Sequence, residues 1–327
     1  MISEQAYNDS NTWTAMDDGT LLYLRRWKTK EAPKAVLHIV HGMAEHSKRY
    51  ARLADHLGEE GIEVWAADQR GHGETACNKL NDPGKGGLLG HCADGDGFSR
   101  VSRDIDILNR AIIKEYPEVP VFLMGHSWGS FIVQNYLENF EGVGDKAVTL
   151  SGSILSGSRG PDGIKISTGA AFMSFLTFIL GEKYRSKFAK ALADGPYNKA
   201  FKPNRTEFDW LSRDEKEVDF YVADTLCGFL CSVGFYRDMA RALKRIHLPE
   251  EMGKIRKELP IYVFSGSADP VGDMGESPAS LIVAYRHLGI NDLETVLYPD
   301  ARYETLNETN RDEVTGSLSS WLLRHCS

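Results

Sequence analysis

The strongest constraint on the fold of this 327-residue chain is an alternation of short apolar runs with longer amphipathic segments. The runs at 34–42 (KAVLHIVHG), 62–68 (IEVWAAD) and 119–125 (VPVFLMG) are almost continuously apolar, as in strands covered on both faces. Residues 47–61 and 96–116, which lie between them, follow helical patterns. The other predicted elements are a β-hairpin at 11–27, helices at 128–140, 280–289 and 311–326, and a strand at 293–299. This spacing predicts an α/β fold with a mostly parallel sheet wrapped by helices.

The alternation is interrupted once. After a predicted strand at 145–153, the sequence reads as helix and loop only, until a strand-like run at 259–267. We therefore expect an α/β core made of residues 1–153 and 259–327, with a helical cap, residues 154–258, inserted between two strands of the sheet. A cap at the carboxyl ends of the strands would cover the edge where open α/β sheets bind ligands.

Composition excludes some classes of protein. The net charge is -8, whereas a sequence-independent nucleic-acid binder needs clustered Lys and Arg, so no nucleic-acid partner is expected. Residues 1–13 lack the basic-then-apolar pattern of a signal peptide, and the apolar window 169–181 is too short to span a bilayer of about 30 Å. These features favour a cytoplasmic protein.

The five cysteines predict neither a zinc knuckle nor a disulfide framework, because they are scattered and form no C-x-x-C pair. Cys227 and Cys231 are four residues apart, which would place them on one face of a helix as buried thiols. The glycine-rich stretch 82–91 (DPGKGGLLGH) lacks the Walker spacing and is predicted to be a loop. No cofactor and no metal are expected.

The sequence GHSWG (125–129) has the G-x-S-x-G pattern of a nucleophile elbow, and it lies between a buried strand and a helix. The turn is so tight that side chains at Gly125 and Gly129 would collide with neighbouring backbone. We therefore expect Ser127 to sit in a strained turn with its hydroxyl exposed above the sheet.

A second turn, HGMAEHSKRY (41–50), directly follows the strand-like run KAVLHIV. The backbone N–H groups of Met43 and Trp128 are predicted to form an oxyanion hole, which stabilises the charge that develops on a carbonyl oxygen. The side chains of His41 and His46 are expected to be structural.

A candidate carboxylate follows the next strand. Asp269, in SGSADPVG (265–272), comes at a strand end and is followed by Pro270. Its place after Ser127 agrees with the chain order of the α/β-hydrolase triad, in which serine, acid and base follow one another. The alternative is a solvated aspartate in a turn.

With these blocks the chain resembles the α/β-hydrolases of the monoacylglycerol lipase and lysophospholipase-like group, also called serine aminopeptidase-like. The resemblance covers nearly the whole chain, and DQRGHGET (68–75) and WLSRDEKEVDFYVADTLCGF (210–229) also take part in it. It implies that Ser127 is the nucleophile and Asp269 the acid, with the oxyanion amides at Met43 and Trp128. It also implies hydrolysis of a small single-acyl lipid ester, such as a monoacylglycerol or lysophospholipid, through an acyl-serine intermediate.

The base of the family belongs in a block of the form ARHExLNE, and this chain has ARYETLNE instead, with Tyr303 at the histidine position. A phenol has a pKa of about 10, so at neutral pH it is protonated and cannot accept a proton. A nearby Asp269 carboxylate would raise the phenol pKa further, and we expect the phenol to donate a hydrogen bond to that carboxylate. Loss of the triad histidine costs about 10⁶-fold in turnover in subtilisin.

Two functions therefore stay open: a serine esterase weakened at its base position, and a non-catalytic ligand-binding or regulatory protein on the same scaffold. A peptidase is a weaker alternative, because no peptide-specific feature is visible. Another base could also replace Tyr303, and His72, His91 and His126 are the histidines to test, although the residue before a nucleophile normally points away from it.

The most apolar part of the cap is MSFLTFIL (173–180), with large apolar residues around most of a helix. It is either a helix buried between cap and core, or an apolar wall that guides an acyl chain and touches a membrane or micelle. In the second case Arg185, Lys187 and Lys190 could lie at headgroup level, as in interfacial helices, although a solvated basic face is more common.

Overall fold

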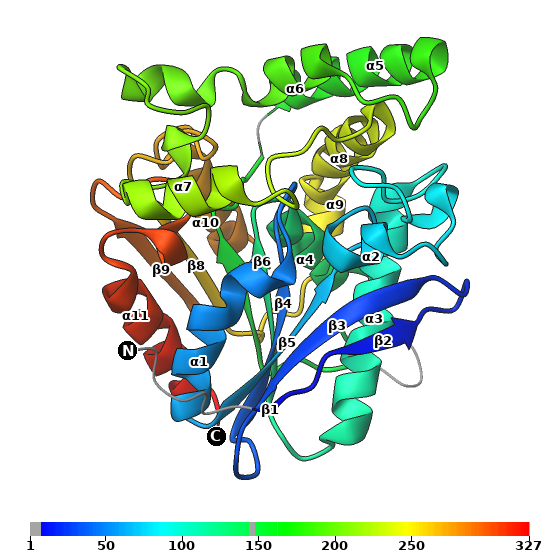
Figure 1. The fold of residues 1–327 in the computed structure, drawn as a ribbon. Coiled ribbons are helices and arrows are strands. Elements are labelled where there is room, and N and C mark those ends of the chain that lie inside the picture. Colours follow the sequence, from blue (N-terminus) through cyan, green and yellow to red (C-terminus); the bar gives the residue numbers. More distant parts are fainter. Residues whose placement is uncertain (1–7, 144–147, 162, 327) are drawn as a thin grey trace.

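The computed structural model describes residues 8–143, 148–161 and 163–326, and their strands form one nine-stranded sheet (Figure 1). The strands are β1 (Asn8–Asp9), β2 (Thr12–Ala15), β3 (Leu21–Lys28), β4 (Ala35–Val40), β5 (Ile62–Asp68), β6 (Val121–His126), β7 (Gly152–Ser156), β8 (Ile261–Gly266) and β9 (Leu293–Tyr298). They follow the order β1-β3-β5-β4-β6-β7-β8-β9, and β2 pairs with β3 off this path. The strands from β5 to β9 are parallel, and β3 joins them antiparallel through β5. The predicted α/β-hydrolase fold with a mostly parallel sheet is thus confirmed.

Helices cover both faces of the sheet (Figure 1). They are α1 (Ala51–Glu59), α2 (Gly73–Cys77), α3 (Gly97–Glu115), α4 (Trp128–Asn139), α5 (Gly163–Leu180), α6 (Lys187–Asp194), α7 (Glu215–Ala223), α8 (Val233–Ile246), α9 (Pro249–Met252), α10 (Glu276–His287) and α11 (Arg311–Arg324). Short 3₁₀ turns are η1 (Ser47–Tyr50), η2 (Pro83–Lys85), η3 (Tyr197–Phe201), η4 (Asp209–Leu211) and η5 (Thr305–Asn307).

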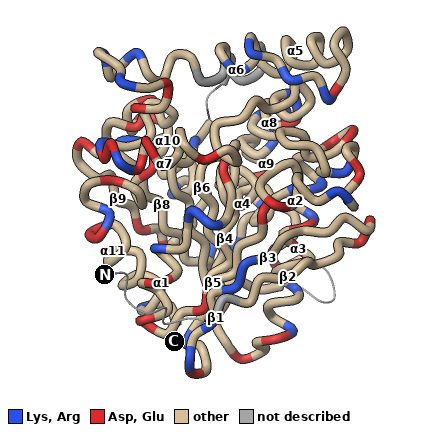
Figure 2. Tube along the Cα trace, in the orientation of Figure 1, with Lys and Arg blue, Asp and Glu red and all other residues tan. Residues whose placement is uncertain are grey.

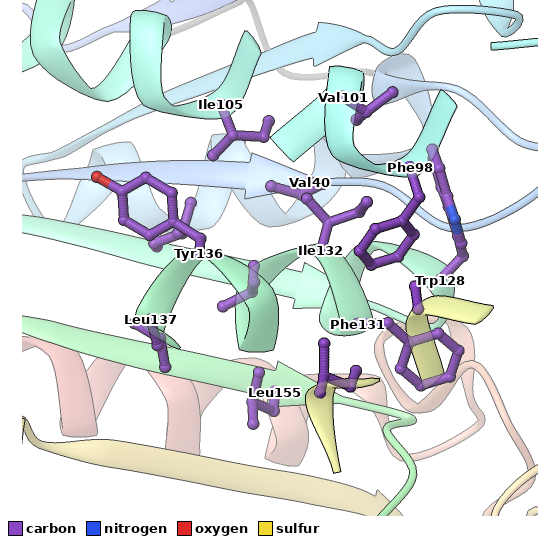
Figure 3. Close-up of a cluster of buried hydrophobic side chains, with 14 of the residues drawn as sticks. Val40, Phe98, Val101, Ile105, Trp128, Phe131, Ile132, Tyr136, Leu137 and Leu155 are labelled. Carbon is purple, nitrogen blue, oxygen red and sulfur yellow. The ribbon is translucent and has the colours of Figure 1, made fainter. Parts of the chain in front are cut away.

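The alternation of side chains along β4 explains the two hydrophobic layers. Val36 and Val40 join the core under α3, α4 and α8, while Leu37 and Ile39 join the core under α1 and α11. Successive residues of a strand point to opposite faces, so a continuously apolar strand serves both layers. Figure 3 shows the first layer, where Val40 and Ile132 of α4 lie among side chains from α3.

Basic and acidic residues are interspersed along the chain trace, as expected for a globular protein with a modest negative charge (Figure 2). None of the helices in the described ranges is both long and apolar enough to cross a bilayer.

Two local predictions were wrong. The strand expected at 145–153 is displaced: β7 occupies Gly152–Ser156 and so extends past the expected boundary at 153, while residues 144–147 lie outside the described part. Cys227 and Cys231 are buried thiols as expected, but they lie in the loop between α7 and α8 rather than on one helix face. Gly228, which has a φ of 64°, interrupts any helix there.

Of the two interpretations of residues 173–180, the helix buried between cap and core is wrong. Met173 and Thr177 are buried and α5 packs on α8, but Phe175 and Phe178 are 60% and 88% exposed. Helices α5 and α6 lie at the top of the molecule as drawn in Figure 1, on the far side of α8 from the sheet. A row of aromatic side chains therefore faces outward from this end of the molecule.

Candidate active site

Ser127 lies between β6 and α4 in the conformation expected for a nucleophile elbow. Its φ of 56° and ψ of -127° are unfavourable for a residue with a side chain. A Cβ at Gly125 would lie 2.4 Å from the Gly129 carbonyl oxygen, and one at Gly129 would lie 2.1 Å from the Val40 carbonyl oxygen. Both positions thus admit only glycine, which is the reason for the glycines of the G-x-S-x-G pattern.

The turn after β4 lies directly against Ser127. A Cβ at Gly42 would come within 3.0 Å of the Ser127 Cβ, and the Gly42 N–H donates to Glu45 Oε1 at 2.5 Å. In the described part of the chain no acceptor takes the Met43 N–H, and the Trp128 N–H has no intrahelical acceptor because Trp128 is the first residue of α4. The two predicted oxyanion amides are therefore placed beside Ser127 with their donors available.

Asp269 is fully buried just after β8. Its carboxylate accepts hydrogen bonds from the Ser265 hydroxyl at 2.9 Å and from the Val271 N–H at 2.8 Å. Burial raises the pKa of Asp269 to about 6, although these hydrogen bonds and Arg159 act in the opposite direction. The solvated turn aspartate considered as an alternative does not describe this residue.

Tyr303 is 4% exposed and stands against Ser127. Its ring packs between His126 and Trp210, with centroid distances of 5.0 Å and 5.2 Å. Burial and the Asp269 charge raise the pKa of the phenol well above its usual value, while a hydrogen bond with the Ser127 side chain lowers it. The phenol therefore stays protonated at neutral pH.

The hydrogen bond predicted from Tyr303 to Asp269 is absent among the described residues, and the phenol contacts the Ser127 side chain. An imidazole carries nitrogens on two edges and can bridge a serine and a carboxylate, whereas a phenol has a single oxygen at the end of its ring. In the described part of the chain the Asp269 carboxylate accepts from Ser265 and backbone amides, and not from Tyr303.

None of the three histidines considered as a substitute base is hydrogen-bonded to Ser127 within the described ranges. His72 stacks on the Trp128 ring and its Nδ1–H donates to the Arg70 carbonyl oxygen at 2.9 Å, and burial lowers the pKa of His72 to about 3. His91 is held by Ser232 and Asp94. His126 reaches the cavity described below, but its Nδ1 pairs with Ser156 Oγ at 3.2 Å.

The histidines of the turn after β4 make structural contacts. His41 Nε2 accepts the Gln69 N–H at 2.9 Å, and His46 Nε2 lies 2.9 Å from Asp224 Oδ2. Neither ring lines the cavity at Ser127.

A cavity of about 560 Å³ opens above Ser127. Half of its lining residues come from the segment between β7 and β8, and the apolar side chains that this segment contributes are Pro196, Tyr197, Ala200, Phe208, Trp210, Leu211, Tyr221, Phe229, Tyr236, Met239 and Leu243. Its volume lies within the range of small-molecule sites.

A charged bridge that the sequence patterns did not reveal joins the two sides of the site. Arg49 donates to Glu45 at 2.7 Å and forms a two-pronged ion pair with Glu304, the residue after Tyr303. All three are largely shielded from solvent. Glu45 in turn accepts the Gly42 N–H, so the bridge fixes the oxyanion turn relative to Tyr303. The sequence hint of this bridge was that the blocks HGMAEHSKRY and ARYETLNE both contain charged residues. The pairing itself could not be read from the sequence, because Arg49 and Glu304 are 255 positions apart.

Comparisons with known proteins agree with this architecture. A profile of the serine aminopeptidase S33 family matches residues 31–310. Monoglyceride lipase of Rattus norvegicus is 31% identical over 261 residues, which are 78% of this chain and 72% of that protein. Monoacylglycerol lipase of Mycolicibacterium smegmatis is 27% identical over 303 residues, which are 91% of each chain.

Among solved structures, a thermostable carboxyl esterase from Bacillus coagulans superposes with a TM-score of 0.85 at 24% identity, covering 99% of this chain and 100% of that one. A soluble variant of monoglyceride lipase from Saccharomyces cerevisiae gives a TM-score of 0.75 at 21% identity, covering 99% and 97%. At these identities the structural matches show the shared fold.

Proposed function

Because the chain belongs to the serine aminopeptidase S33 family and is similar to monoglyceride lipases, we propose that it is a lipid-esterase-type serine hydrolase whose turnover is slowed by Tyr303. The observation that carries this proposal is the cavity itself. Ser127 stands in an elbow at its base, with the amides of Met43 and Trp128 beside it. Such an arrangement is suited to an acyl carbon at Ser127 and a developing negative charge on the adjacent oxygen.

In this proposal the Ser127 Oγ forms a bond to the ester carbonyl carbon, and the two amides hold the oxyanion. The bond between the carbonyl carbon and the alkoxy oxygen then breaks, and the alcohol leaves with the proton that Ser127 has lost, which gives an acyl-serine. Water then releases the fatty acid. The slow step is removal of the serine proton, because the Tyr303 phenol that hydrogen-bonds to Ser127 already carries its own proton. The oxyanion hole and substrate binding alone can still supply about 10³-fold over the uncatalysed reaction.

The lining of the cavity favours a substrate with a single acyl chain, such as a monoacylglycerol or a lysophospholipid. Aromatic and aliphatic side chains from the segment between β7 and β8 cover the site. We propose that this segment acts as the cap expected at 154–258, resting on a core of residues 1–153 and 259–327.

We expect the protein to hydrolyse p-nitrophenyl acyl esters slowly, with a preference for acyl chains long enough to fill the apolar cavity. Steady-state release of p-nitrophenol should exceed that of Ser127→Ala, which lacks the nucleophile. Equal rates for the two proteins would show that the site does not turn over esters.

That outcome would favour the second candidate function, a non-catalytic lipid-binding protein. The observation that supports this function is the protonated Tyr303 phenol in contact with Ser127, which cannot act as a base. A fluorophosphonate probe separates the two functions, because it reacts with an activated serine. Rapid labelling of Ser127 in the unmodified protein would rule out the non-catalytic function.

We further propose that the outward face of α5 and α6 docks on a lipid surface when the protein collects its substrate. Large apolar side chains project from it: Phe175 is 60% exposed, Phe178 88% and Phe188 61%. Monomeric soluble proteins rarely expose contiguous apolar patches of this kind. The basic residue Lys187 is exposed on α6 next to Phe188, and helices that lie at membrane interfaces combine basic and apolar residues in this way.

The substitution Phe178→Asp should reduce cosedimentation with vesicles of phosphatidylcholine and phosphatidylglycerol by about tenfold, since it removes one buried aromatic anchor and adds an anionic repulsion. A matched control is Leu80→Asp, because Leu80 is 82% exposed but lies away from α5 and α6. Equal loss of binding in both variants would contradict docking through α5 and α6.

A further inference from the structure

Three side chains with different ligand atoms converge beside the oxyanion turn. His46 Nε2, a carboxylate oxygen of Asp224 and Cys227 Sγ all lie within 4.8 Å of one another. His46 comes from the turn after β4, while Asp224 and Cys227 come from the loop after α7. His46 and Cys227 are buried, but the Asp224 side chain is 36% exposed, which leaves a path to solvent.

We propose that His46, Asp224 and Cys227 form a binding site for a divalent transition-metal ion of the Zn²⁺ class. Imidazole, carboxylate and thiolate are the three ligand types that Zn²⁺ accepts, with bonds of about 2.0–2.3 Å. The three ligand atoms already lie within 4.8 Å of one another, and the exposed side at Asp224 leaves a fourth position for water. This set was invisible in the sequence, because His46 and Asp224 are separated by 178 positions.

The protonation states define what binding requires. Burial alone would raise the pKa of the Asp224 carboxyl, but hydrogen bonds with His46 and the Leu226 N–H outweigh this effect. The net pKa is therefore lowered, and the carboxylate is ionised. Burial raises the pKa of the Cys227 thiol, so the metal must displace the thiol proton to solvent. For a metal to bind at His46 Nε2, the hydrogen bond between this atom and Asp224 Oδ2 must break, and the imidazole proton must lie on Nδ1.

Two neighbouring features set the affinity. The Arg49 guanidinium lies near Cys227 and would repel a cation, but ion pairs with Glu45 and Glu304 offset its charge. In the described part of the chain His46 Nδ1 is buried without an acceptor. A missing outer hydrogen bond of this kind weakens metal binding by about 10–100-fold, so we expect the site to bind Zn²⁺ more weakly than a structural zinc site.

Bound metal would reinforce a contact that already exists. The Ala44 carbonyl accepts hydrogen bonds from the Tyr221 hydroxyl at 3.0 Å and from the Gly228 N–H at 2.9 Å. The loop after α7 thus already rests on the turn after β4, and a metal would replace the direct contact of His46 with Asp224 by a link that also includes Cys227. This inference concerns binding and does not depend on hydrolysis at Ser127.

The test is titration of the metal-free, untagged full chain with Co²⁺, which reports thiolate coordination by a ligand-to-metal charge-transfer band in the near ultraviolet. We expect one equivalent of bound Co²⁺, displaced by Zn²⁺. Cys227→Ser should abolish the band, whereas the control Cys231→Ser should keep it, because Cys231 is buried in the same loop but lies outside the cluster. Absence of the band, or its survival in Cys227→Ser, would overturn the proposal.

A second measurement distinguishes loss of a metal ligand from local misfolding of the Cys227→Ser variant. Zn²⁺ at a hundredfold excess over its Kd should raise the Tm by roughly 4 °C, because the ion binds only the folded protein. His46→Asn and Asp224→Asn should each lose this rise while keeping the Tm of the metal-free protein within a few degrees. A Zn²⁺-dependent rise that persists in both variants would place the metal elsewhere and contradict the proposed site.

Discussion

Replacing Tyr303 by histidine should raise kcat/KM for p-nitrophenyl acyl esters by at least about 10³-fold. The rest of the site is in place: Ser127 is in the elbow conformation, and Asp269 is buried with its carboxylate near the base position. An imidazole titrates near neutrality, so it can take the serine proton during attack and return it to the leaving alcohol. We expect less than the full 10⁶-fold value of a triad histidine, because the surroundings are packed around a longer phenol.

The control for this prediction is Tyr303→Phe. It removes the phenol oxygen from Ser127 without supplying a base, so it should leave the rate within a few-fold of the unmodified protein. If Tyr303→His is no faster than Tyr303→Phe, then position 303 does not present a base to Ser127. The gain should also disappear in the double variant Ser127→Ala/Tyr303→His, which separates catalysis at Ser127 from background hydrolysis.

The sequence predicted the fold well, because several features agreed. The strands β4, β5 and β6 are apolar on both faces, and the glycines at 125 and 129 occupy positions that admit no Cβ. Local sequence was a poorer guide to β7, which occupies Gly152–Ser156, whereas the apolar pattern predicted a strand at 145–153.

The contacts of the site depended on long-range geometry that the sequence could not supply. The motifs identified Ser127, Asp269 and Tyr303, but they did not show that the phenol contacts the serine rather than the carboxylate. Nor could they reveal the bridge of Arg49 to Glu304, since a pattern cannot pair residues about 255 positions apart. The sequence left two interpretations of 173–180 open for a related reason, because a helix that is apolar all round does not show which side faces water.

Loss of the histidine has a consequence for stability as well as for rate. Asp269 is a buried carboxylate whose pKa is raised by burial to about 6, above the value of about 3.9 in an unfolded chain. A carboxyl with a raised pKa contributes its stability below the unfolded pKa, and that contribution is lost as pH rises through 6. Above that pH the folded protein carries a buried charge that lacks the imidazole partner expected in this family.

Asp269→Asn should therefore stabilise the unmodified protein by about 2 kcal/mol at pH 7.5, and most of this gain should be lost at pH 4, where the folded carboxyl is almost fully protonated and the unfolded one is about half protonated. The asparagine carbonyl can still accept the Val271 N–H, and its amide can donate to the Ser265 hydroxyl. Urea unfolding at the two pH values measures the effect, and the exposed Asp300→Asn should show little change at either pH. Destabilisation by Asp269→Asn at pH 7.5 would mean that the charge has a favourable partner.

In the Tyr303→His background, the stabilisation by Asp269→Asn should be smaller and the rate of ester hydrolysis should fall. The reason is that a histidine at position 303 would pair with the Asp269 carboxylate, so the charge would then have a partner and a role in catalysis.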